Sequence, residues 1–121
     1  MSIFSGTYEP SAYFSPVPKG IVLHLLTGMP NDLLKATDML SKDLFNKVRN
    51  PAFALIVSCA GRFAYLQKDI PKEQEIIKKQ FKDAPFIGFY GYSEQSTLPG
   101  GTCGSFCQTI VGLTMSDDLA V

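Results

Sequence analysis

The stretch "AFALIVSCAGR" (Ala52–Arg62) decides the fold, because six consecutive apolar residues end abruptly at small and charged ones. An apolar run of this length without alternation is typical of a strand buried on both faces. Ser58 and Cys59 close the strand, and the "AGR" that follows indicates a tight turn. We therefore expect Ala52–Cys59 to be an inner strand of a sheet.

Helical and strand-like patterns surround this strand. The segments Pro30–Asn50 and Asp69–Asp83 carry apolar residues at helical spacing, the second through Ile70, Ile77 and Phe81. Further strands are expected over Ile21–Gly28, Pro85–Glu94 and Ser105–Met115. The order β-α-β-α-β-β predicts an α/β (α+β) fold with a mixed sheet. Its first three strands would be parallel, two helices would pack on it, and a C-terminal antiparallel hairpin would close it.

The chain of 121 residues is long enough for one domain with a modest core. We expect a single domain over 1–121, with an irregular lead-in over 1–19, where prolines gather. The glycine-rich segment 95–104 is expected to form the loop of the last hairpin. It lacks the lysine of a phosphate-binding loop.

Charge and composition exclude several function classes. Eleven basic and eleven acidic residues balance, so the chain has no electrostatic footprint for nucleic acid. Its apolar runs are too short to span a membrane, and no signal peptide is recognisable at the N-terminus. An odd number of cysteines, three, favours the cytoplasm, and their spacing gives no metal site. The low charged fraction of 18% suggests a surface covered by a partner domain or a second copy.

The turn after the central strand is the first candidate site. Ligands of open α/β sheets bind beyond the carboxyl ends of the strands. Gly61 would let a ligand approach the backbone, and Arg62 offers a planar fork for a carboxylate or phosphate. The alternative is a structural arginine that pairs with Glu94 or with a backbone carbonyl.

The strand "GFYGYSEQ" (Gly88–Gln95) is the second candidate site. Tyr90, Tyr92 and Glu94 alternate onto one face, where they would form an amphipathic pocket wall. With Arg62 they would fit a zwitterion such as an amino acid. The sequence leaves open whether Arg62 and Glu94 hold a ligand or each other.

A thiol enzyme that uses Cys59 is a remote alternative. A nucleophilic thiol needs a base, and the one histidine, His24, falls within the expected strand Ile21–Gly28. We therefore expect a non-enzymatic protein without a cofactor.

Three segments resemble the C-terminal part of FIST sensory domains: "ALIVSCAGR", "PFIGFYGYSEQ" and "SFCQTIVGLTM". The residues that carry the resemblance are Ser58, Cys59, Arg62, Gly88, Phe89, Tyr90, Tyr92, Glu94, Gln108 and Thr109. The sequence departs from the family pattern at Ser93, where glycine is usual, at Gln95, and around Phe106 and Cys107.

The resemblance implies a module of bacterial signalling that binds an amino acid or similar small polar metabolite. The ligand set expected from it and from the two motifs is Cys59, Gly61, Arg62, Tyr90, Tyr92 and Glu94. The partners that it implies are an N-terminal FIST half or a homodimer, and an output domain such as a histidine kinase, a cyclase or a chemotaxis receptor. A protein-interaction or dimerisation module without a ligand is the alternative.

Overall fold

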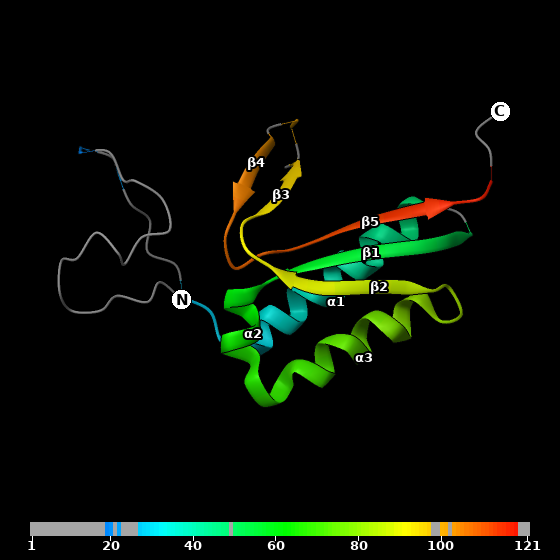
Figure 1. The fold of residues 1–121 in the computed structure, drawn as a ribbon, viewed down its shortest axis with the longest axis horizontal. Coiled ribbons are helices and arrows are strands. Elements are labelled where there is room, and N and C mark those ends of the chain that lie inside the picture. The colour runs from blue at the N-terminus through cyan, green and yellow to red at the C-terminus, as the bar shows by residue number, and fades with distance from the viewer. Residues whose placement is uncertain are drawn as a thin grey trace.

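The computed structural model describes residues 19–20, 22, 27–48, 50–97, 100–101 and 103–118. Their elements follow one another as α1 (Pro30–Lys47), β1 (Pro51–Cys59), α2 (Ala60–Leu66), a 3-10 turn (Gln67–Asp69), α3 (Ile70–Phe81), β2 (Phe86–Gly91), β3 (Glu94–Thr97), β4 (Cys103–Phe106) and β5 (Ile110–Ser116). Figure 1 shows a sheet with the helices gathered on one side and a hairpin that stands off its end. The fold is α+β with helices packed on a mixed sheet, as the element order predicts.

The main sheet has the strand order β2-β1-β5, so β1 is central. β1 and β2 are parallel and are joined through α2 and α3. β5 runs antiparallel along the other edge of β1, with Leu55 opposite Leu113. The predicted C-terminal antiparallel hairpin is present as β3 and β4. The remainder of the expected last strand, β5, pairs with β1 and not with the strand over Pro85–Glu94, because the chain crosses the end of β1 first. Thr109 marks that crossing, since its carbonyl accepts the Cys59 N–H at 3.0 Å.

The antiparallel hairpin is a separate, two-stranded sheet of β3 and β4. It pairs Glu94 with Phe106 and Thr97 with Cys103. Both ends of the expected loop 95–104 are therefore strand, residues 95–97 in β3 and residues 103–104 in β4. β2 stops at Gly91 because Ser93 has a φ of 66°, a left-handed conformation that ends the strand and turns the chain.

The expected first strand, Ile21–Gly28, lies mostly outside the described residues, as does most of the lead-in 1–19. Thr27–Met29 are described and lead into α1 without strand pairing. Met29 caps that helix, because its N–H donates to the Asp32 carboxylate at 2.8 Å and Pro30 occupies the first turn.

The helices cover one face of the sheet. Ala54, Ile56 and Ser58 alternate along β1 and are buried beneath α1 and α3, where Ile77 and Phe81 complete the core. The residues between them are only partly buried, so the prediction that β1 is buried on both faces is wrong. An apolar run without alternation can also belong to a strand that has one uncovered apolar face.

The segment after β1 is helical from its first residue. Cys59 caps α2, which begins at Ala60 in place of the expected tight turn. The second predicted helix is confirmed as α3, with Pro71 in its first turn. None of the described helices is both long and apolar enough to cross a membrane.

Replacing Phe81 tests where the core lies. Phe81 is 2% exposed and meets Phe45 edge-on, so we expect Phe81→Ala to lower the free energy of unfolding by about 3–5 kcal/mol. Urea titration followed by circular dichroism measures the change. Met39→Ala is the control, because Met39 is 68% exposed on α1 and should change stability by less than about 0.5 kcal/mol.

Candidate functional site

Arg62 lies inside the protein, beneath the helices. Its side chain is 1% exposed, although guanidinium groups are almost never fully buried without partners. Nε donates a hydrogen bond to the Ser58 hydroxyl at 3.1 Å. Nη2 donates to the Leu33 carbonyl at 3.1 Å and to the Thr37 hydroxyl at 2.8 Å. The guanidinium therefore links β1 and α2 to the first turns of α1.

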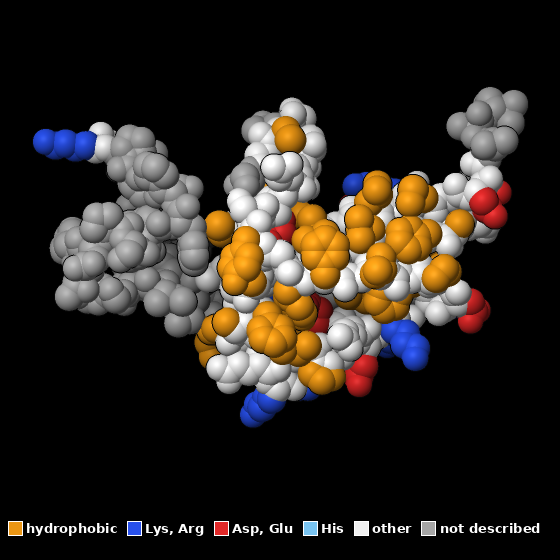
Figure 2. Space-filling model, in the orientation of Figure 1, with side chains coloured by type: hydrophobic (Ala, Val, Ile, Leu, Met, Phe, Trp, Pro, Cys, Tyr) orange, Lys and Arg blue, Asp and Glu red, His pale blue; other side chains and the backbone are white. Residues whose placement is uncertain are grey.

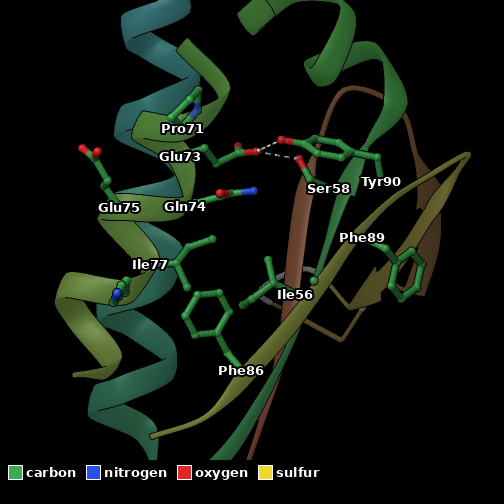
Figure 3. Close-up of a pocket in the computed structure, with 12 residues that line it drawn as sticks. Ile56, Ser58, Pro71, Glu73, Gln74, Glu75, Ile77, Phe86, Phe89 and Tyr90 are labelled. Atoms are coloured by element: carbon green, nitrogen blue, oxygen red, sulfur yellow. Dashed lines mark hydrogen bonds between the residues drawn. The ribbon is translucent and has the colours of Figure 1, made fainter. Parts of the chain in front are cut away.

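The ionic partner of Arg62 is Glu73, in the first turn of α3. Glu73 is 3% exposed, and its Oε1 accepts from Arg62 and from the Thr37 hydroxyl at 3.0 Å. Its Oε2 accepts from the Tyr90 hydroxyl at 2.8 Å and from the Ser58 hydroxyl at 3.4 Å, as the dashed lines in Figure 3 show. Each carboxylate oxygen thus has two donors, which a buried charge needs to offset its lost hydration.

Sequence reasoning missed Glu73, although a signal was present. Glu73 lies three residues after Ile70 and four before Ile77, on the stripe that the helical spacing assigned to the core. A carboxylate at a core position requires a buried cation as partner. By that rule, a carboxylate on the buried stripe of the helix is the expected partner of a buried Arg62.

Burial and the hydrogen bond to Glu73 raise the pKa of the Tyr90 hydroxyl far above its ordinary value of 10.0. The Glu73 charge adds to the effect, because a tyrosinate beside it would meet a like charge. The hydroxyl therefore remains a hydrogen-bond donor over the whole physiological pH range.

Glu94 occupies a different place, where β3 begins. It is 3% exposed, and its Oε2 accepts from the Thr109 hydroxyl at 3.1 Å. Its Oε1 is buried and has no hydrogen-bond partner. Among the side chains of the described residues, Thr114 Oγ1 is the other buried atom in this condition. An unpaired oxygen on a carboxylate costs more than one on a neutral hydroxyl, because the charged group loses more hydration.

Two cysteines and a glycine lie near Glu94 at the carboxyl end of β1. Cys59 is buried and Cys107 is exposed. Partial desolvation of the Cys107 thiol, followed by the proximity of Cys59 and Glu94, raises its pKa. Gly61 packs against the chain beside them, since a Cβ there would lie 3.2 Å from Cγ of Gln108. The cluster therefore combines one carboxyl group with two thiols.

The six residues expected to bind a ligand fall into three places. Cys59, Gly61 and Glu94 lie together around the end of β1. Arg62 and Tyr90 belong to the network around Glu73. Tyr92 is 89% exposed between β2 and β3.

A cavity of about 380 Å³ opens between α3 and the edge strand β2. Ile56, Ile77 and Phe86 form its apolar part, while Ser58, Glu73 and Tyr90 close its polar end (Figure 3). The polar groups at that end are already hydrogen-bonded to one another, so the cavity offers apolar contact more than free polar groups.

No group of three or more His, Cys, Asp or Glu side chains that could hold a metal ion occurs in the described part of the chain. The three cysteines are free thiols.

Comparison with known proteins identifies one family. The sequence model of the FIST C domain matches residues 11–97, most of the chain, and confirms the resemblance. Two of the three motifs fall within that match, and the third, "SFCQTIVGLTM", lies beyond it. No curated protein and no solved structure matches the chain.

Removing the guanidinium of Arg62 should destabilise the fold strongly. Arg62→Ala leaves the Glu73 charge buried without its cation, so we expect the free energy of unfolding to fall by about 3–5 kcal/mol. Urea unfolding gives the difference. The control is Lys72→Ala, which breaks the exposed pair with Asp69 and should cost less than about 1 kcal/mol. Equal effects of the two variants would contradict a structural role for the buried pair.

The raised pKa of Tyr90 predicts a loss of stability at alkaline pH. Because the folded-state value lies above the unfolded-state value of 10.0, the hydroxyl stabilises the fold fully below that pH and progressively less above it. Urea midpoints measured upward from about pH 8 should therefore decline less steeply in Tyr90→Phe than in the unchanged protein. Tyr92→Phe, which removes a hydroxyl from an exposed ring, is the control. An equal change of slope in both variants would contradict the role of the contact between Tyr90 and Glu73.

Proposed function

This chain belongs to the FIST C domain family, a family of sensory-type signalling domains, and we propose that it binds an amino acid or a similar small polar metabolite. Binding would occur at the carboxyl end of β1, where Glu94 accepts the ligand's amine. The ligand-bound state would be read by an output domain, of the histidine kinase, cyclase or chemotaxis receptor kind, in the cytoplasm. An N-terminal FIST half would complete the sensor.

The unpaired oxygen of Glu94 is the observation that carries this proposal. Buried polar groups nearly always have a hydrogen-bond partner, and an exception calls for an explanation such as a ligand or an ion. An ammonium group would supply the missing donor and a countercharge together. Its location agrees with the rule that open α/β sheets bind ligands beyond the carboxyl ends of their strands.

The surroundings of Glu94 favour a cationic group on the ligand. Glu94 lies near the Thr109 hydroxyl and the Cys107 thiol, and neither of these groups can carry a positive charge. Cys107 is exposed, so a ligand reaching Glu94 would pass close to it.

Arg62 and Tyr90 have a positioning role in this proposal. The Nε and Nη2 groups of Arg62 already donate to protein acceptors, and Tyr90 donates to Glu73. They hold α2 and β2 against β1, and so fix the strand end that carries Cys59. The exposed ring of Tyr92 is available to stack on a bound ligand.

A non-catalytic role fits the thiols. Burial limits access to the Cys59 sulfur, and the raised pKa of Cys107 lowers its thiolate fraction. Both features disfavour a nucleophile.

Calorimetric titration with each of the twenty amino acids tests the proposal. We expect binding by at least one of them, and Glu94→Gln should weaken it about tenfold or more, because a hydrogen bond to a charged partner contributes about 1.5–3 kcal/mol. The same substitution should leave the stability of the unliganded protein unchanged or higher, since it removes a buried charge with an unpaired oxygen.

Glu75→Gln is the matched control, because Glu75 is exposed on α3 and lines the separate cavity. It should leave the affinity unchanged. No binding by any amino acid, or equal weakening by the two glutamine variants, would count against Glu94 as the ligand's acceptor.

A further inference from the structure

The face of the sheet that turns away from the helices is apolar throughout. Strand register places Ile87, Leu55 and Leu113 in one row across the three strands. Phe89, Val57 and Val111 form the next row, and Phe53 lies opposite Met115 in a third. Because side chains of directly paired residues share a face, these eight side chains form one continuous surface, here called the open face.

The open face is exposed to solvent. Ile87, Phe89 and Leu113 are each more than half exposed, and Met115 is 48% exposed. Figure 2 shows hydrophobic side chains gathered over β1, β2 and β5 on the side toward the viewer. In the same orientation α1 lies behind the sheet and α3 lies below β2 (Figure 1).

No charged residue occurs in β1, β2 or β5. Exposed strands of monomeric proteins commonly carry charged side chains that prevent association, and the open face has none. Four of its side chains are about half exposed or more, so its exposed apolar area falls in the range of about 300–600 Å² that the largest patches of monomers reach. The parallel pairing of β1 with β2 adds to this argument, because parallel strands are ordinarily covered on both faces.

We propose that the open face is the contact surface of a homodimer, in which a second copy of this chain packs sheet against sheet. A two-fold contact brings each residue near the same surface of its partner, so a charged face would repel itself. The open face avoids this repulsion because all its side chains are neutral and apolar.

The area of the open face limits the size of the interface. Two copies together would bury on the order of 1,000 Å², which falls below the range of about 1,200–2,000 Å² typical of stable interfaces and in the class of weak, transient contacts. We therefore expect a weak dimer that forms as the protein concentration rises. The two sheets would lie about 10 Å apart with their strands about 30° from parallel, as in other aligned sheet packings.

Sedimentation velocity over micromolar to submillimolar concentrations of the full chain tests this interface. We expect the sedimentation coefficient to rise with concentration to the value of a dimer. Leu113→Lys and Ile87→Lys should each weaken dimerisation more than about a hundredfold, because each places two like charges in an apolar contact. Met39→Lys, at an exposed methionine of α1, should leave the dimer unchanged.

Thermal unfolding of the same variants at low concentration separates the alternatives. Both lysine variants should melt at the temperature of the dilute unchanged protein, since their side chains are more than half exposed in one copy. A protein that stays monomeric at every concentration overturns the proposal. If the lysine variants of such a monomer also melt early, another part of the same chain covers the open face. A dimer that survives both substitutions overturns it as well, because its contact then lies elsewhere.

Discussion

The buried contact between Arg62 and Glu73 is the constraint on which the rest of the structure depends. Through these two side chains and their partners Thr37, Ser58 and Tyr90, the network reaches α1, β1, α2, α3 and β2. An apolar core of equal volume could hold the same elements together, since replacing buried ion pairs with apolar groups is often neutral or stabilising. The network adds directional contacts, which fix the rotation of α3 about its axis and the height of α2 above the strand.

Because side chains alternate along β1, this one strand contributes to the core and ion-pair network, to the open face and to the proposed ligand site. Its even-numbered residues meet the helices, where Ser58 joins the ion-pair network and Ile56 the core. Its odd-numbered residues form the middle of the open face, and its last residue, Cys59, donates its N–H to Thr109, whose hydroxyl donates to Glu94. A shift of one residue in register would bring the open face beneath the helices and Ser58 into solvent. Both the core and the network therefore hold the register that the proposed ligand site requires.

Sequence reasoning predicted the parts of the fold that local spacing determines. The stripe of Ile70, Ile77 and Phe81 predicted α3, and the apolar run before Cys59 predicted β1. The pairing of β5 with β1 depends on how the chain from Gly91 to Thr109 crosses the end of the sheet, which no local pattern specifies. The sequence allows Arg62 and Glu94 to pair, because each falls at the end of an expected strand, but the packing of α3 makes Glu73 the partner of Arg62. The sequence does not indicate the burial of Glu94 either, since a charged residue at the start of a strand is ordinarily solvated.

The position of Glu94 connects the proposed ligand site to the β3–β4 hairpin. Glu94 is the first residue of the β3–β4 hairpin, and Thr109, its partner, is the last residue before β5. The hairpin pairs only with itself in the strand ladders, so its attachment to the sheet depends on these two ends. A ligand that donated a hydrogen bond to Oε1 would stabilise the conformation in which Glu94 and Thr109 stay in contact. It would favour that conformation by the difference between its binding free energies to this and to other conformations. Ligand binding at one buried oxygen would thereby fix the orientation of the whole hairpin, and an output domain that contacts the hairpin could respond to that change.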